Sequence, residues 1–351
     1  MGHKLAFIGF GTVGQGLAEI LRDKHEDLKA NEHFEAEIVA ISDFNKGAIY
    51  HPNGLDIDTV LQVLQETGNL ENYPPSPGLV TGWDSLKTIR ETNADTVIEV
   101  SYTDVRTGQP AIDHCRTAFL AKKNVVMTNK GPVALAYKEL SELAKKEGVY
   151  WGFEGTVMSG TPSLRMPASA LAGNEITEIR AILNGTTNFI LTKMEEEGAT
   201  YDEALKEAQL LGYAEADPTS DVEGYDARYK ITILANYVMN EPLRVEEVSC
   251  RGITNLTPKD IEEAKAEGKR WKLLAKARKE NGKVDASIAP EKVDMSDPLA
   301  SISGAVNAIA YECDLLGTVT LSGAGAGKVE TGFSLLIDLI NIDRERRLVN
   351  I

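Results

Sequence analysis

The residues best suited to chemistry lie in an acidic segment that ends in a lysine. Asp226 and Lys230 are four residues apart, so a helix would place them on one face. Their row continues through Leu234 and Val238, which favours a pair pointing inward or into a cleft over an exposed ion pair. Four more acids precede Asp226, and they are Glu215, Asp217, Asp221 and Glu223. Such a cluster suits a cationic ammonium substrate. The alternative is a metal site, but no histidine lies nearby and the spacing is not that of an EF-hand.

Two helices and a loop must position this segment. Residues 200–203 have the pattern of a capping box, which opens a helix that stops at Gly212. We expect a loop over residues 213–218 and a second helix from about Asp221 to Met239.

A polar stretch lies upstream of these helices. Residues 176–183 alternate like a strand, and Asn184-Gly185-Thr186-Thr187-Asn188 then leads into a helix beginning near Phe189. The hydroxyl and amide groups of this stretch either cap the helix or hold a small polar substrate.

A glycine motif stands near the start of the chain. The apolar run 5–8 is followed at once by Gly9-Phe10-Gly11-Thr12-Val13-Gly14, and apolar residues then recur at helical spacing. In this context Gly9 permits a tight turn, Gly11 lets the backbone approach a pyrophosphate, and Gly14 lets the helix pack close to the strand. The helix N-terminus would attract the phosphates. The motif predicts dinucleotide binding; the alternative is a tight turn without a ligand.

A second strand, over residues 38–42, ends in Asp43. An acid at this place accepts the ribose 2′-hydroxyl of NAD, although Asp43 lies further beyond Gly14 than is usual. Lys46 is close by and suits a 2′-phosphate instead. The alternative role for Asp43 is that of a solvated turn residue.

Further strands and helices alternate after Asp43. We expect strands over residues 96–101 and 124–128, with helices over 83–92 and 109–122. Ligands collect beyond the carboxyl ends of parallel strands. The polar residues at such ends are Ser101, Thr103, Asn129 and Lys130. By composition alone, Lys130 fits an exposed loop lysine better than a ligand-binding residue.

Two more stretches are rich in small residues. Residues 154–162 follow an expected strand over 150–154, and their carbonyl groups are suited to an ion or ligand. Gly323-Ala324-Gly325-Ala326-Gly327 precedes a helix over 329–340. This second glycine turn favours either another phosphate or nicotinamide contact or close packing of the helix on the sheet.

The order of these elements predicts an α/β fold, with a Rossmann-type doubly wound parallel sheet and a second α+β domain. We expect residues 1–150 to form the dinucleotide-binding domain, completed by 305–351, and residues 151–304 to form the substrate-binding and catalytic domain. In the later part of the chain we expect helices from 257 to 279 and strands over 284–293, 305–314 and 317–321.

Composition narrows the partners and the compartment. The formal net charge of −16 makes nucleic acid and anionic membranes poor partners. The sequence has no apolar run long enough for a transmembrane helix, and its N-terminus has no signal-peptide layout. The three cysteines are far apart, which fits a reducing cytoplasm.

The stretch Ala208–Lys230, with Gly212-Tyr213-Ala214, Glu215, Asp217-Pro218, Asp221 and Asp226, resembles the homoserine dehydrogenase signature. The glycine motifs at 9–14 and 323–327, together with residues 128–132 and 184–187, resemble that family in the same order. The resemblance implies reversible reduction of L-aspartate 4-semialdehyde to L-homoserine with NAD or NADP, in threonine and methionine biosynthesis. It also implies a homodimer. The chain ends soon after the last expected helix, so we expect no regulatory ACT domain and no inhibition by threonine through one.

The resemblance also assigns roles. Lys130 and Lys230 become proton-transfer candidates, with Asp226 among the catalytic residues. Glu215 and Asp221 would hold the substrate, and Tyr213 and Thr186 would line its pocket. We expect the cofactor to contact Gly9, Gly11, Thr12, Val13, Gly14, Asp43, Ser101, Thr103, Lys130 and Gly327. A sodium-type site is implied at Glu154, Val157, Ser159 and Thr161.

Two rival functions fit less well. An aldehyde dehydrogenase needs an activated cysteine, but Cys115 falls mid-helix at a core position beside Ile112 and Phe119. A non-catalytic dinucleotide sensor would have no reason to keep the acid–lysine segment that ends at Lys230.

Overall fold

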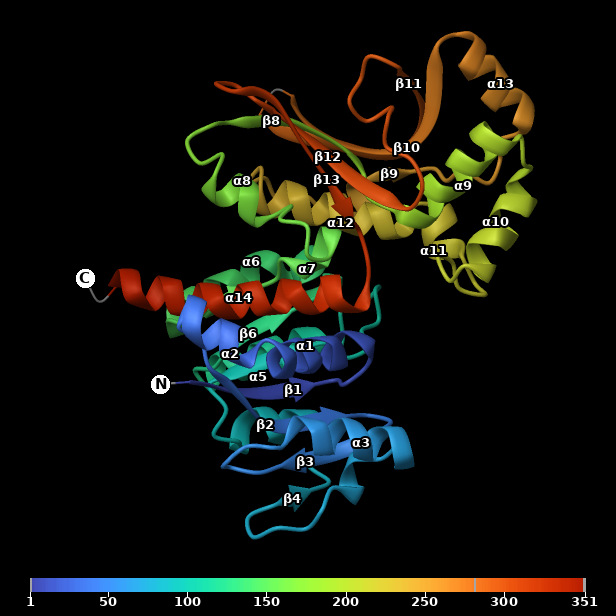
Figure 1. Ribbon diagram of the computed structural model, residues 1–351. Helices are drawn as coiled ribbons and strands as arrows, with labels where there is room; N and C mark the ends of the chain where they lie inside the picture. Colours follow the sequence, from blue (N-terminus) through green and yellow to red (C-terminus); the bar gives the residue numbers. More distant parts are fainter. Residues whose placement is uncertain (1, 281, 350–351) are drawn as a thin grey trace. The chain divides into compact units, whose positions relative to one another are not determined.

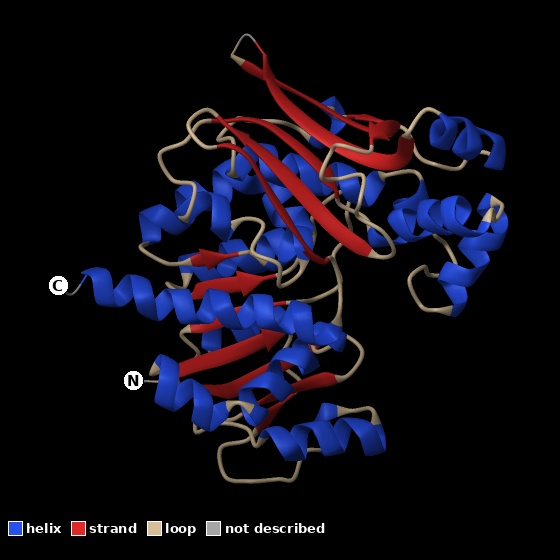
Figure 2. Ribbon diagram, turned by 45° about the horizontal axis from the view of Figure 1, so that its top comes forward, coloured by secondary structure: helices blue, strands red, loops and turns tan. Residues whose placement is uncertain are grey.

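The computed structural model describes residues 2–280 and 282–349. The chain forms two compact units. The first unit is Met1–Gly160 together with Gly327–Ile351, and the second is Thr161–Ala326. The expected α/β fold class, with a Rossmann-type sheet and a second domain, is confirmed (Figures 1 and 2).

The first unit contains a seven-stranded sheet in the order β4-β3-β2-β1-β5-β6-β7. Strands β2, β1, β5, β6 and β7 are parallel, whereas β3 and β4 add an antiparallel edge. Since β1 lies between β2 and β5, the chain changes direction across the sheet at this point, which is where such folds bind ligands. The strands are β1 His3–Ile8, β2 Ala36–Asp43, β3 Gly47–Tyr50, β4 Val80–Thr81, β5 Thr96–Glu99, β6 Asn124–Met127 and β7 Trp151–Gly152.

The helices of the first unit lie on both faces of this sheet (Figure 2). They are α1 Thr12–Asp23, α2 His25–Asp27, α3 Ile57–Thr67, α4 Ser85–Glu91, α5 Ala111–Leu120, α6 Lys130–Glu147, α7 Gly155–Met158 and α14 Lys328–Val349, with a π-turn at Leu28–Glu32 and a 3₁₀ turn at Leu70–Asn72. The C-terminal α14 lies beside α1 (Figure 1). A Cβ at Gly16 would stand 2.4 Å from the Lys328 carbonyl oxygen, so this close approach requires glycine.

The core of the first unit joins the sheet to α1 and α14. Leu5 and Phe7 of β1 pack in one apolar cluster with Leu17 of α1 and Leu335 and Leu339 of α14, and all five are fully buried. Burial of each large apolar side chain stabilises the fold by about 1.5–3 kcal/mol. Segments from both ends of the chain therefore depend on each other for stability.

The second unit contains a six-stranded sheet in the order β13-β12-β8-β10-β11-β9. Its strands are β8 Ile176–Ile182, β9 Ser249–Cys250, β10 Lys269–Glu280, β11 Lys283–Asp294, β12 Val306–Cys313 and β13 Gly317–Ala324. Its helices are α8 Arg165–Ser169, α9 Gly185–Glu197, α10 Tyr201–Leu210, α11 Thr219–Val222, α12 Tyr225–Tyr237 and α13 Pro258–Ala266, with a 3₁₀ turn at Val245–Glu247.

The expected domain boundaries differ from the observed ones. Residues 305–326 do not complete the Rossmann domain, because β12 pairs with β13 along its whole length and with β8 over Ala308–Cys313, both in the second sheet. Only the chain from Gly327 onward joins the first unit. The first boundary lies at Gly160 rather than at residue 150, because α7 packs on α14.

The sequence predicted helix over residues 257–279, and this prediction is wrong beyond α13. Gly268 adopts a left-handed φ of 69°, and the chain then enters β10. All twelve residues of β10 pair with β11 in an antiparallel hairpin. Lysine, leucine and alanine favour helix locally, but partner strands on both sides override that weak preference.

Smaller differences concern helix ends near the acidic segment. The expected helix from Asp221 to Met239 is divided into α11 and α12, because Gly224 is left-handed with a φ of 81°. Helix α9 begins at Gly185, ahead of Phe189, because the Asn184 side chain caps it by accepting from the Thr187 amide. The capping box of Thr200 and Glu203 is confirmed.

Candidate active site

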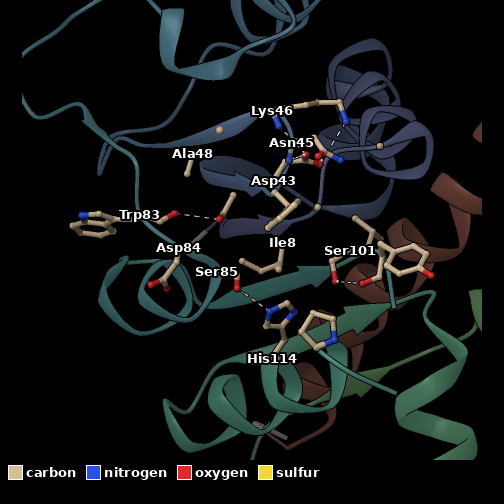
Figure 3. A pocket seen from close by; sticks show the side chains of 18 of the residues that line it. Ile8, Asp43, Asn45, Lys46, Ala48, Trp83, Asp84, Ser85, Ser101 and His114 are labelled. Carbon is tan, nitrogen blue, oxygen red and sulfur yellow. Dashed lines mark hydrogen bonds and ion pairs between the residues drawn. The ribbon is translucent and has the colours of Figure 1, made fainter. Parts of the chain in front are cut away.

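A pocket of about 890 Å³ lies at the carboxyl ends of β1, β2 and β5 (Figure 3). Its wall includes Gly9, Gly11, Asp43 and Ser101, which the sequence predicted as cofactor contacts. The wall also includes residues that were not predicted: Phe44, Trp83, Asp84, Ser85, Tyr102 and His114. The pocket therefore stands at the place in the sheet where a dinucleotide was expected.

The glycine turn has the geometry that its motif requires. Gly9 has a φ of 88°, and a Cβ there would stand 2.5 Å from the Val100 carbonyl oxygen. At Gly11 a Cβ would meet nothing within 4 Å, so the space beside it is open. No side chain caps the N-terminus of α1, where Thr12 and Val13 begin the helix. These features fit the phosphates of a dinucleotide.

Asp43 makes several contacts of its own. One carboxylate oxygen accepts from the Phe10 amide at 2.7 Å, and the other accepts from the Asn45 and Lys46 amides at 3.0 Å. Burial raises the pKa of this carboxyl, but these amides and the ammonium of Lys46, 3.6 Å away, outweigh it and hold the pKa below its usual value. Asp43 thus keeps the turn together and still lines the pocket as an anion.

The other predicted strand-end residues lie around the same edge of the sheet. The Ser101 hydroxyl donates to the buried Glu99 carboxylate. Within the described residues, the Thr103 hydroxyl is buried without a hydrogen-bond partner. Lys130 is the first residue of α6 and is half-buried.

The pocket residues that were not predicted lie on elements whose sequences showed no sign of a binding role. The His114 side chain is buried and hydrogen-bonds Glu99, although its sequence context is an ordinary amphipathic helix. Ser85 opens the short helix α4. Phe44 directly follows Asp43 at the end of β2 and is fully exposed. Its position after the predicted ribose contact, not its exposure, is what the sequence could have used.

In the second unit, the acid–lysine pair is inside the protein. The Lys230 ammonium lies 2.8 Å from the Asp226 carboxylate and donates to the Leu183 carbonyl at 2.7 Å. Lys230 is only 7% exposed, which confirms the inward-facing row and excludes a surface ion pair. The desolvated ammonium is held by two oxygen acceptors.

Asn184 joins this pair to the next acid, and the sequence predicted its stretch either as a helix cap or as a contact for a small polar substrate. Its amide donates to Asp221 at 2.7 Å and to Asp226 at 3.2 Å. The Thr186 hydroxyl lies 3.2 Å from Asp221 and 2.6 Å from the Tyr213 carbonyl. Burial, and then the nearby Asp226, raises the pKa of Asp221. Asp221 and Asp226 thus lie close together, and a bound cation would stabilise their negative charges.

Two predicted substrate residues stand at the edge of this network. Tyr213 is partly exposed, with its ring 5.0 Å from that of Phe189. Glu215 is exposed, and its carbonyl accepts from the Gln209 side chain. The structure therefore places Asp221, Asp226, Lys230 and Thr186 together but leaves the Glu215 carboxylate on the surface.

The residues implied for a monovalent cation divide between the two units. Glu154 and Val157 are buried in the first unit, and Ser159 has an unusual φ of 53° there. Thr161 begins the second unit, where its hydroxyl donates to the Ala324 carbonyl at 3.1 Å. In residues 2–280 and 282–349, no three His, Cys, Asp or Glu side chains form a metal-binding group.

Gly327 begins the return of the chain to the first unit and has a φ of 141°. A Cβ there would stand 2.0 Å from the Glu330 carboxylate. The turn before α14 therefore needs glycine for a conformational reason of its own, independent of any ligand.

Cys115 is fully buried, and burial raises the pKa of its thiol well above the usual value. It is not an activated nucleophile, which argues against the aldehyde dehydrogenase alternative.

No helix of the described chain is long and apolar enough to cross a membrane.

A Rossmann sheet with a glycine turn at its ligand edge, and a second unit that buries an acid–lysine network, define a two-domain dehydrogenase. A family model for homoserine dehydrogenase matches residues 162–340, and one for Glutamate/Leucine/Phenylalanine/Valine dehydrogenase matches residues 1–105. The chain belongs to the homoserine dehydrogenase family. The predicted NAD(P)-dependent enzyme of that family is thereby confirmed.

Relatives match along nearly the whole chain. An NAD(+)-dependent homoserine dehydrogenase from Pseudomonas canavaninivorans is 43% identical, covering 97% of this chain and 96% of that protein. A homoserine dehydrogenase structure from Thiobacillus denitrificans has 30% identity and a TM-score of 0.84, covering 99% of this chain and 74% of the other. A hyperthermophilic archaeal homoserine dehydrogenase in complex with NADPH has 32% identity and a TM-score of 0.82, covering 98% of each.

Proposed function

We propose that this chain interconverts L-homoserine and L-aspartate 4-semialdehyde, with the dinucleotide in the pocket of the first unit and the substrate at the acid–lysine network of the second. The observation that carries the proposal is the buried Lys230–Asp226 pair, joined through Asn184 to Asp221. Two neighbouring carboxylates and an ammonium suit a substrate that carries both an amino group and a hydroxyl.

The chain's own residues then have distinct tasks. The bound nicotinamide supplies or accepts the hydride. Lys230 donates a proton to the oxygen of the forming alcohol and stabilises its negative charge, and it takes the proton back in the reverse direction. Asp221 and Asp226 hold the substrate ammonium, and Thr186 and Tyr213 border the site. Lys130 at the start of α6 is the second proton-transfer candidate.

Asp43 favours NAD over NADP, because a carboxylate accepts from a ribose hydroxyl and repels a 2′-phosphate. Lys46, 3.6 Å from Asp43, offsets part of that repulsion. We therefore propose use of both cofactors with NAD preferred. The proposed cofactor contacts are Gly9, Gly11, Thr12, Val13, Gly14, Ser101, Thr103, Lys130 and Gly327. Of these, Gly9, Gly11 and Ser101 line the pocket.

We further propose a cytoplasmic homodimer that binds a monovalent cation near Glu154, Val157, Ser159 and Thr161. The strained Ser159 backbone supports the cation, since unusual dihedral angles cluster at ligand sites. Replacing sodium with tetramethylammonium at constant ionic strength should lower activity. An unchanged rate would rule out the proposed cation site. Light scattering coupled to gel filtration measures the oligomer.

A spectrophotometric assay tests the proposed reaction. Purified protein should reduce NAD or NADP with L-homoserine and not with malate or lactate, because only homoserine offers an ammonium group to Asp221 and Asp226. No turnover with either cofactor from pH 7 to about 10, a range that reaches the lysine pKa, would rule out the reaction.

A further inference from the structure

Glu99, the last residue of β5, is a fully buried acid directly behind the cofactor pocket. One of its oxygens accepts from the Ser101 hydroxyl and from His114 Nδ1, the latter at 2.9 Å. The other oxygen accepts from the Asn129 amide. Ser101 and His114 both line the pocket, so one carboxylate fixes two parts of its wall.

The network continues through His114 to the opposite wall. His114 Nε2 lies 2.8 Å from the Ser85 hydroxyl, and this contact is drawn in Figure 3. In the neutral imidazole whose Nδ1–H donates a hydrogen bond to Glu99, Nε2 is an acceptor, so the Ser85 hydroxyl donates to it. Glu99 thus connects the end of β5, helix α5 and the start of α4.

Asn129 extends the same network to α6. Asparagine at a helix N-cap normally accepts from the first-turn amides, but no such bond is present at Asn129. Its amide instead donates to Glu99 and to the Ser101 carbonyl, the latter at 2.9 Å. The next residue is Lys130. The orientation of the α6 start is therefore set by Glu99 rather than by a cap.

A purely structural explanation of this network is weak. Burying a carboxylate is costly, and apolar packing gives equal or greater rigidity. At the other end of β5, Asp95 ties the strand to His3 and to the Lys4 amide while remaining partly exposed. The buried acid is the one on the pocket side of the sheet.

We propose that Glu99 is a positioning residue for the dinucleotide: it holds Ser101, His114 and Asn129 so that the pocket wall and Lys130 face the cofactor in one fixed arrangement. This inference rests on the proposed function in that the pocket binds NAD or NADP. It assigns Glu99 no contact with the substrate.

The first test is Glu99→Gln, which keeps the shape but turns one acceptor oxygen into a donor NH₂. That NH₂ must face either Asn129 or the His114–Ser101 side. Loss of a charged hydrogen bond and a shift of the wall should raise KM for NAD(P) roughly tenfold and lower kcat by roughly ten- to a hundredfold. The control is Asp95→Asn, which should keep both constants while lowering the melting temperature.

A second variant, Asn129→Ala, tests the same network if Glu99→Gln does not fold. Because Asn129 makes no capping bond, this variant should stay folded while kcat falls. Either folded variant with wild-type KM and kcat would overturn the positioning role.

Cofactor binding can be measured even if the proposed reaction does not occur, so the two proposals are tested separately. If the wild type does not oxidise homoserine, titration of NAD and NADP against the fluorescence of Trp83 in the pocket wall still measures the cofactor. Roughly tenfold weaker binding by Glu99→Gln would support the inference, whereas equal binding would overturn it.

Discussion

Lys230 is the residue on which the proposed chemistry depends most. Lys230→Met should lower kcat by roughly 10²–10⁴-fold, the range for a general acid–base group, while KM for NAD(P) stays nearly constant. Because the pair with Asp226 is buried, the variant should also lose about 3–5 kcal/mol of stability. Melting temperature and kcat are therefore measured on the same preparation. A folded variant with near-normal kcat would move the catalytic role to Lys130.

Asp43 holds the turn and is proposed to select the cofactor, and two variants separate these functions. Asp43→Asn keeps an acceptor for the turn amides but removes the charge, so the ratio of kcat/KM for NAD to that for NADP should fall roughly tenfold. Asp43→Ala should weaken both cofactors and NAD more, because it also releases the Phe10 amide. Equal losses for the two cofactors in both variants would mean that Asp43 does not contact the ribose.

Among single residues, the sequence predicted those whose partners are near in the chain. Asp226 and Lys230 share a helical row, and the glycines at 9–14 share a motif, so local spacing was enough. Glu99, and the contacts of Asn184 with the acids, were not predicted, because the partners are more than ten residues away on other elements. Glu215 was predicted with its neighbours, but the loop leaves its side chain exposed.

At the scale of elements, the glycine turn predicts two different losses. Gly9→Ala would force a Cβ to 2.5 Å from the Val100 carbonyl at a φ of 88°, so it should lower the melting temperature strongly. Gly11→Ala meets nothing within 4 Å and should fold normally, but it should raise KM for NAD(P) because the Cβ occupies space for the phosphates. The reverse pattern would contradict the assignment of the turn.

In the hairpin of β10 and β11, sequence patterns predicted the strand β11 but missed β10. Residues 269–279 carry helix-favouring side chains, and only the pairing with β8 and β11 makes them a strand. Elements with a clear cap or motif, such as the helix opened by Thr200, were predicted well because their signals are local.

That hairpin buries Lys272, which gives the second unit a pH dependence. Burial lowers the pKa of Lys272 to about 8, and its ammonium donates to Asn188 at 3.1 Å and to the Ile302 carbonyl. Between pH 8 and the unfolded value of 10.5, the unfolded chain binds more protons, so the free energy of unfolding should rise with pH. The gain is at most on the order of 3 kcal/mol.

Denaturant unfolding from pH 7 to 10.5 measures this gain. Lys272→Met should lack it, whereas Lys276→Met, on the same strand but paired with Glu291 near the surface, should keep it. Identical pH profiles for the wild type and Lys272→Met would contradict the prediction.

At the scale of the whole molecule, the division into two units was predicted but its boundaries were not. Residues 305–326 looked suited to the first domain because they precede its last helix, yet β12 and β13 complete the second sheet. The pocket and the acid–lysine network are thus built by separate units, each from its own sheet and helices. The proposed reaction requires both units to act on one pair of molecules.

Transfer of an isotope between substrate and cofactor tests that requirement most directly. L-Homoserine with deuterium in place of both hydrogens on its hydroxyl carbon is incubated with oxidised NAD or NADP, and the reduced cofactor is analysed by NMR spectroscopy and mass spectrometry. We expect one deuterium at C4 of the nicotinamide for each molecule of semialdehyde formed, since the hydride moves directly. Reduced cofactor without the label, or no reduced cofactor at all, would contradict it.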